Sequence, residues 1–187
     1  MDMGSIFIIH SAYGSPEENW IPWLKNKLEG MGQTVFAPKF PTPENQNLES
    51  WMKVFDGYRQ YLGSDSIFVG HSIGVAFILN VLEGLDRPVK AAFLVSGFKA
   101  LIGIPAFDNI NRTFVERSLD WKKIRGNCGK FYMLHSDNDP YVPLANAEEV
   151  AKNLGIDITV VKGAGHFNQK AGYTKFDLLL ERIKEDI

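Results

Sequence analysis

The sequence contains very little cysteine, since Cys128 is the only one among 187 residues. A single thiol cannot form a disulfide within the chain, and it excludes both a disulfide scaffold and a zinc site built from four cysteines. No other residues have the spacing of metal ligands, and we expect neither a metal nor a cofactor. Because so little cysteine fits a reducing compartment, we expect a cytoplasmic protein.

Long hydrophobic runs are also absent. Uninterrupted apolar stretches such as Val75–Leu79 are far shorter than the ~18 residues that a bilayer-spanning helix needs. The opening residues Met1-Asp2-Met3-Gly4 include no basic segment, so we do not expect a signal peptide. The sequence therefore predicts no membrane span.

Neither sign of charge is in excess. Lys and Arg together number 20 and Asp and Glu 22, which gives a formal net charge of −2 at pH 7. This balance argues against a strongly basic surface that binds nucleic acid. The length is close to the roughly 150 residues of an average domain, so we expect residues 1–187 to form a single domain.

What the sequence does contain is a regular alternation of two patterns. Short runs rich in β-branched and aromatic residues predict six strands, at Ser5–His10, Thr34–Ala37, Ser66–Gly70, Ala91–Ser96, Lys130–His135 and Asp157–Lys162. Segments with apolar residues at helical spacing lie between and after them, at Glu17–Met31, Leu48–Leu62, Ile73–Leu85, Leu144–Leu154 and Lys175–Ile187. This alternation predicts the α/β class, as a three-layer α/β/α sandwich around a six-stranded, mainly parallel sheet.

One stretch interrupts the alternation. Residues 97–129 contain Pro105, Asn109 and Asn111 in a mixed pattern, and we expect a looped insertion with a short helix near Leu119–Ile124. In a parallel sheet of this class ligands bind beyond the carboxyl ends of the strands. The insertion follows one of these ends, which makes it a candidate for a small lid.

A candidate nucleophile follows the third predicted strand. Gly70-His71-Ser72-Ile73-Gly74 has the form G-x-S-x-G and stands between a strand and an apolar helical segment. In this context the serine occupies a sharp, strained turn, and the glycines let the strand and the helix approach each other. A structural turn without chemistry would have the same pattern, so the partners of Ser72 must decide between the two interpretations.

A serine hydroxyl needs a base, which is normally an imidazole that a carboxylate orients. Among four histidines we choose His166, because it follows the last predicted strand in a loop of small residues. We expect His71 to pack or hydrogen-bond beside the serine, since adjacent side chains diverge on a sharp turn. His10 and His135 each end a strand, where loop hydrogen bonding is the more common role.

The carboxylate is expected between the serine and the histidine in the chain, after the penultimate strand. That loop contains two aspartates, Asp137 and Asp139. We favour Asp139, because Pro140 forces it into an extended conformation and stiffens the loop. Asp137 is then expected to hydrogen-bond within the turn.

An oxyanion needs backbone N–H donors, one from the residue after the nucleophile and one from the loop after the first strand. Ile73 is the first candidate. Ala12 is the second, with Tyr13 as the alternative.

These residues and several further motifs resemble the α/β-hydrolase superfamily, and within it the small serine hydrolases related to retinoblastoma-binding protein 9 and its bacterial relatives. The resemblance covers nearly the whole chain. Besides the G-x-S-x-G segment it rests on Trp20-Ile21-Pro22-Trp23-Leu24, Ala37-Pro38-Lys39-Phe40-Pro41, Asp120-Trp121-Lys122-Lys123-Ile124, Asn127-Cys128, Asp139-Pro140-Tyr141-Val142-Pro143 and Gly165-His166-Phe167.

The resemblance implies a minimal hydrolase core, a triad of Ser72, Asp139 and His166, and hydrolysis of esters. The expected partner is therefore a small-molecule ester, with short or accessible groups because the insertion is short. The chain has no L-x-C-x-E motif, so the sequence does not indicate a protein partner of the retinoblastoma type. Two alternatives stay open, which are a protein-interaction module on the same fold and an acyl transferase or peptidase that uses the same triad.

Overall fold

A computed structural model describes residues 4–187 of the chain. Its six strands form one sheet in the order β2-β1-β3-β4-β5-β6, and each neighbouring pair is parallel. The strands are β1 (Ser5–Ile9), β2 (Thr34–Phe36), β3 (Ile67–His71), β4 (Val89–Val95), β5 (Cys128–Ser136) and β6 (Ile158–Val161). The predicted α/β class and all six predicted strands are confirmed, and the sheet is parallel throughout.

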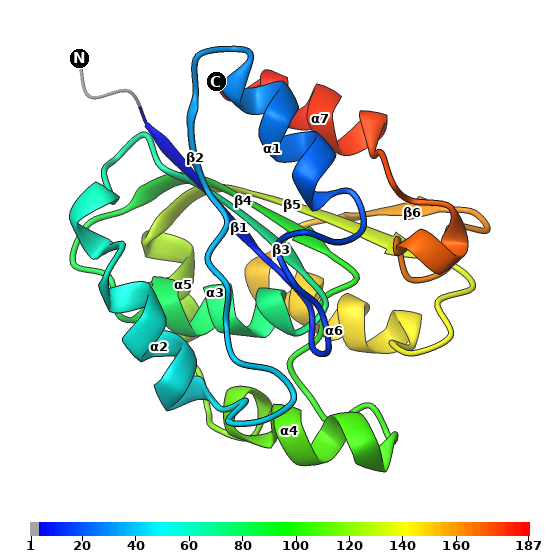
Figure 1. Ribbon diagram of the computed structural model, residues 1–187. Coiled ribbons are helices and arrows are strands. Elements are labelled where there is room, and N and C mark those ends of the chain that lie inside the picture. Colours follow the sequence, from blue (N-terminus) through cyan, green and yellow to red (C-terminus); the bar gives the residue numbers. More distant parts are fainter. Residues whose placement is uncertain (1–3) are drawn as a thin grey trace.

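Helices cover both faces of the sheet (Figure 1). One face carries α1 (Ile21–Glu29) and α7 (Asp177–Lys184), and the other carries α2 (Leu48–Asp56), α3 (Ile73–Glu83), α5 (Trp121–Gly126) and α6 (Leu144–Leu154). Successive strand residues point to opposite faces, so Phe7 and Ile9 belong to the core under α2 and α3, whereas Ile6 and Ile8 belong to the core under α1. The result is the three-layer sandwich that the alternation predicts.

Helix α3 is the most deeply buried helix, with every residue from 73 to 82 buried. It packs on β3 and β1 on one side, and it contacts α4 (Pro105–Val115) and α5 elsewhere on its surface. A helix that is apolar on all sides is stable only where neighbours surround it. Burial of each of its larger apolar side chains contributes about 1.5–3 kcal/mol, so the start of α3 is firmly anchored in the fold.

The prediction of a looped insertion with one short helix is wrong, because residues 97–129 also contain the eleven-residue helix α4 and the first residues of β5. The second helix, α5, confirms the one expected near Leu119–Ile124. The inward face of α4 is made of Asp108, Asn111, Phe114 and Val115. Phe107, Ile110 and Phe114 have helical spacing, but two of the four buried residues are polar and Pro105 and two asparagines stand among them, which gives the segment a mixed pattern in the sequence.

Four helices are shorter than predicted, namely α1, α2, α3, which ends at Glu83, and α7, which spans Asp177–Lys184. Helix α1 begins at Ile21 rather than Glu17, and Pro22 lies in its first turn, where a missing N–H does no harm. Helix α2 ends at Asp56, and a separate short 3₁₀ turn follows at Arg59–Tyr61. Within residues 4–187, each helix is too short or too polar to cross a membrane.

Candidate active site

Ser72 occupies the turn between β3 and α3. Its backbone has φ 58° and ψ −121°, a region that costs a non-glycine residue on the order of 1–3 kcal/mol. The strand and helix on either side hold it there, and its N–H donates to the carbonyl oxygen of Val95 at 2.9 Å. Such strain, maintained by the surrounding core, is typical of residues that act in a site.

The two glycines that flank Ser72 stand where a side chain has no room. A Cβ atom on Gly70 would lie 2.6 Å from Cδ1 of Ile78, and one on Gly74 would lie 2.6 Å from the carbonyl oxygen of Ile9. Both distances are shorter than real Cβ contacts allow. The glycines therefore let α3 approach β3 and β1 closely, as the G-x-S-x-G pattern predicts.

His166 and Asp139 form a hydrogen-bonded pair, with Nδ1 of the imidazole 2.8 Å from Oδ2 of the carboxylate. The other carboxylate oxygen accepts the backbone N–H groups of Tyr141 and Val142 at 2.9 and 3.0 Å. Burial acts to raise the pKa of Asp139, but the hydrogen bond and charge of His166 and these two N–H groups outweigh it and lower the pKa. An ionised Asp139 accepts a hydrogen bond from Nδ1–H of His166, which leaves Nε2 as the ring nitrogen that can act as a base.

Asp137, the alternative carboxylate, lies elsewhere in the site. Its Oδ1 accepts the N–H of Gly163 at 2.8 Å, which lies in the loop before His166 and not in the turn of Asp137 itself, where the hydrogen bond was expected. Two neighbours act in the same way, since Ser136 Oγ accepts from Ala164 at 3.0 Å and Asn138 Oδ1 accepts from Gly165 at 2.8 Å. The end of β5 and the loop after it thus hold the backbone just before His166, and the sequence did not indicate this function of Ser136 and Asn138.

Each of the other three histidines forms a hydrogen bond with the backbone. The ring of His71 bonds through Nε2 to the carbonyl oxygen of His166 at 2.8 Å, and its burial, followed by the nearby charge of His166, lowers its pKa to about 3. His135 bonds through Nε2 to the carbonyl oxygen of Val142 at 3.0 Å. His10 accepts the N–H of Phe40 at Nε2, 3.0 Å away.

The two candidate oxyanion donors lie on facing segments. Ile73 is the first residue of α3, and the first N–H groups of a helix have no acceptor within it. The loop after β1 turns at Ala12 and Tyr13, where Gly14 N–H closes onto the Ser11 carbonyl oxygen. Tyr13 N–H already donates to Oγ1 of Thr42 at 2.7 Å, which favours Ala12 over Tyr13 as the second donor.

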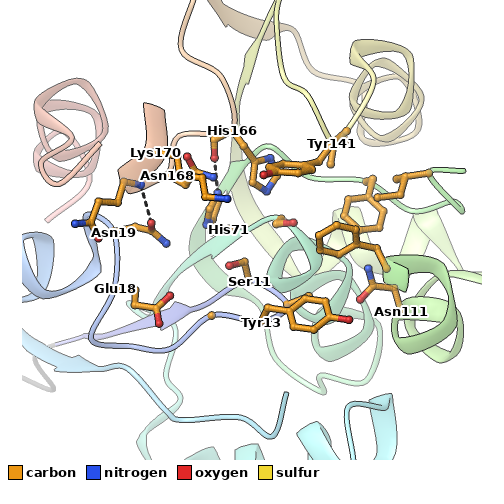
Figure 2. A pocket seen from close by; sticks show the side chains of 18 residues that line it. Ser11, Tyr13, Glu18, Asn19, His71, Asn111, Tyr141, His166, Asn168 and Lys170 are labelled. Atoms are coloured by element: carbon orange, nitrogen blue, oxygen red, sulfur yellow. Dashed lines mark hydrogen bonds between the residues drawn. The ribbon is translucent and has the colours of Figure 1, made fainter. Parts of the chain in front are cut away.

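Ser72 and His166 both line a pocket of about 380 Å³, together with Ala12. Figure 2 shows two contrasting sides, with Glu18, Asn19, Asn168 and Lys170 on one and Tyr13, Asn111 and Tyr141 on the other. On the second side the rings form a continuous arc, because Phe107 contacts both Tyr13 and Tyr141 with centroids 5.5 and 5.7 Å apart, and Tyr141 contacts His166. Among residues 4–187, no group of three or more His, Cys, Asp or Glu side chains is arranged to hold a metal ion.

Known structures share this architecture. The ydeN gene product of Bacillus subtilis superposes with a TM-score of 0.90 and 27% identity over 97% of each chain. Est1E of Butyrivibrio proteoclasticus superposes with a TM-score of 0.74 and 16% identity over 98% of this chain and 88% of the other. The fold is that of the α/β hydrolases.

The family follows from the sequence. The model of the serine hydrolase family matches residues 6–185, and the chain belongs to this family. Among curated relatives, YdeN of Bacillus subtilis is 28% identical over 94% of this chain and 92% of its own length. Serine hydrolase RBBP9 of Rattus norvegicus is 26% identical over 88% of this chain and 84% of its own length. The resemblance drawn from the motifs is confirmed, and the protein is a serine hydrolase.

Proposed function

We propose that this hydrolase cleaves carboxylic esters through an acyl-enzyme on Ser72, with His166 as general base and acid and Asp139 as the carboxylate that orients it. One observation carries the proposal. A serine on a strained turn and an imidazole with its Nδ1 bonded to a buried carboxylate line the same pocket. This is the combination of a nucleophile, a base and an orienting group that acyl transfer requires.

In the first half of the reaction, Oγ of Ser72 attacks the ester carbonyl carbon while its proton passes to Nε2 of His166. The carbonyl oxygen becomes an oxyanion, which the N–H groups of Ile73 and Ala12 stabilise. The positive end of α3 adds to this stabilisation. When the bond to the alkoxy oxygen breaks, Nε2 returns the proton to that oxygen, and the alcohol leaves.

In the second half, His166 takes a proton from water as the water oxygen attacks the acyl carbon. The bond from Oγ to that carbon then breaks, Oγ recovers the proton from Nε2, and the carboxylic acid leaves. The negative charge of Asp139 stabilises the imidazolium in both halves.

No metal or cofactor takes part in this scheme, and the partner is a small ester. We infer the cytoplasm as the place of action from the low cysteine content.

The test is labelling with a fluorophosphonate, read by mass spectrometry, together with hydrolysis of short-chain para-nitrophenyl esters. We expect one adduct on Ser72 of the wild type, none on Ser72→Ala, and greatly slowed labelling of His166→Ala. Ser96→Ala is a matched control, because Ser96 also follows a strand with a positive φ of 48°, yet it does not line the pocket. It should label and hydrolyse like the wild type.

Three outcomes would contradict the proposal. Hydrolysis by folded, pure Ser72→Ala at the wild-type rate would exclude the acyl-enzyme. Absence of both adduct and hydrolysis in the wild type would favour an interaction module on a hydrolase fold. Added alcohols and amines test for acyl transfer, and products formed with them in place of the free acid would replace hydrolysis as the function.

A further inference from the structure

Asn111 is a polar residue in an unusual position. It lies on the inward face of α4, and only 2% of its surface is exposed to solvent. It nevertheless lines the pocket that contains Ser72. In Figure 2 its amide lies on the same side of the pocket as Tyr13 and Tyr141, away from Glu18. A side chain that is hidden from bulk solvent but borders the pocket can meet a bound substrate.

A chain of hydrogen bonds fixes the orientation of this amide. Tyr13 N–H donates to Oγ1 of Thr42 at 2.7 Å, and the Thr42 hydroxyl donates onward to Oε1 of Gln46. Gln46 therefore presents its Nε2 to the next group, and it donates to Oδ1 of Asn111 at 2.6 Å. Because the amide oxygen of Asn111 is the acceptor in this chain, its Nδ2 is the atom left to donate.

Apart from the hydroxyl groups of Tyr13 and Tyr141, the side of the pocket that contains Asn111 is built from aromatic rings, since Phe107 packs between Tyr13 and Tyr141. The apolar residues Phe98, Ile102 and Val142 also line the pocket. A ligand group that fills the space displaces water from the amide. A purely apolar group would then leave the N–H donors unpaired, which costs binding free energy, whereas a group with an oxygen acceptor would pair with them.

We propose that Asn111 determines substrate specificity by donating from Nδ2 to a hydrogen-bond acceptor on the apolar half of the ester. The substrate class is an ester with an aromatic or similarly flat apolar group that has an ether or carbonyl oxygen at its far end. The inference rests on the proposed function, since it assigns the substrate of the same site. The apolar group belongs to either the acyl half or the alcohol half of the ester, and the experiment distinguishes these two cases.

The experiment compares esters that differ only in an oxygen atom against a methylene. For the alcohol half, the pair is para-methoxybenzyl acetate and para-ethylbenzyl acetate. For the acyl half, the pair is methyl para-methoxyphenylacetate and methyl para-ethylphenylacetate. In one of the two pairs we expect the wild type to prefer the methoxy ester by roughly tenfold in kcat/KM, the size of one net hydrogen bond.

The variants separate recognition from structure. Asn111→Leu should lose the preference for the methoxy ester, because the donor is gone. Asn111→Asp keeps an acceptor for Gln46 and places an oxygen where Nδ2 was, so it should also lose the preference, and it serves if Asn111→Leu fails to fold. Asn109→Leu is the matched control, since it makes the same change at an exposed position of the same helix, and it should keep the preference.

Binding to Ser72→Ala distinguishes failure of this inference from failure of the proposed function. Dissociation constants of the four esters, measured by calorimetry, do not depend on turnover. The same preference should appear in binding to Ser72→Ala and vanish in Ser72→Ala/Asn111→Asp. Equal affinity for the methoxy and ethyl members of both pairs, or a preference that survives the change at position 111, would overturn the inference even if the protein cleaves esters. If the wild type hydrolysed no ester at all, this result would instead contradict the proposed function.

Discussion

Nε2 of His71 lies 2.8 Å from the backbone carbonyl oxygen of His166, and the two imidazole rings lie with their centroids 4.8 Å apart. Since a carbonyl oxygen can only accept, Nε2 of His71 carries the proton. Its Nδ1 is buried without a hydrogen-bond partner in the described part of the chain. The residue next to the nucleophile in sequence therefore holds the backbone of the proposed base, and it does so as a neutral imidazole.

The first prediction concerns the pH dependence of stability. Burial, followed by the charge of His166, lowers the pKa of His71 from 6.5 to about 3 in the folded protein. The unfolded chain therefore binds more protons below pH 6.5, and stability falls as the pH falls. On acidification from about pH 7.5 to about pH 5, His71 alone should lower the free energy of unfolding by about 2 kcal/mol.

His71→Gln checks this value, because an amide can still donate to the His166 carbonyl oxygen but does not titrate. Urea unfolding at both pH values gives the free energy of unfolding of each protein. The wild type should lose about 2 kcal/mol more than His71→Gln on acidification. Parallel losses in the two proteins would show that His71 does not remain neutral in the fold.

The second prediction separates the two aspartates of the loop after β5. Asp139→Asn removes the charge that stabilises the His166 imidazolium and favours the wrong tautomer, so kcat should fall by on the order of 10³-fold or more. Asp137→Asn keeps an oxygen for the N–H of Gly163 and should stay within a few-fold of the wild type. Steady-state hydrolysis of a para-nitrophenyl ester measures both. Similar losses in the two variants would contradict the assignment of Asp139.

A third prediction concerns the paired tryptophans. The buried indole of Trp20 donates from Nε1 to the carbonyl oxygen of Phe167 at 2.9 Å, directly after His166. Trp20→Phe leaves that oxygen unpaired, so the free energy of unfolding should drop by about 1–3 kcal/mol and kcat should fall with KM little changed. Trp23→Phe is the control, because Trp23 is only half-buried and donates no side-chain hydrogen bond within residues 4–187. Equal effects of the two changes in urea unfolding would refute this role of Trp20.

Much of this architecture could be predicted from local patterns. The strands follow from runs of β-branched and aromatic residues, and Ser72, Asp139 and His166 follow from a turn motif and the order of residues after successive strands. The structure brings Ser72 and His166 to one pocket and bonds Asp139 to the imidazole. The turn motif is local in sequence, and the strands and helices alternate regularly along the chain, so one sequence suffices to find them.

The rest depends on contacts between distant segments. Helix α4 was missed because Asp108 and Asn111 stand in its buried stripe, and their partners lie outside the helix. Gln46, 65 positions away in the chain, bonds to Asn111, and no pattern near either residue indicates this pair. The role of Trp20 depends on a carbonyl group 147 positions away. Side-chain pairing over such separations is a property of the folded topology.

The last prediction concerns the close approach of α3 to the end of β1. A Cβ atom on Gly74 would lie 2.6 Å from the carbonyl oxygen of Ile9 and 3.0 Å from that of His10. Gly74→Ala must therefore push the backbone that leads to Ala12, the second candidate oxyanion donor. We expect a loss of about 1–3 kcal/mol in the free energy of unfolding. We also expect kcat/KM to fall by more than the decrease in the folded fraction of the protein can explain.

Gly63→Ala supplies the matched control. A Cβ atom there meets nothing within 4 Å, and Gly63 is not among the glycines with a positive φ. The change should leave activity intact and keep the free energy of unfolding equal to that of the wild type or raise it by up to about 1 kcal/mol, since alanine restricts the unfolded chain. Urea unfolding and ester hydrolysis measure both variants. If Gly74→Ala kept full kcat/KM while losing stability, the backbone after β1 would be able to shift without harm to the reaction, and Ala12 would not be the donor.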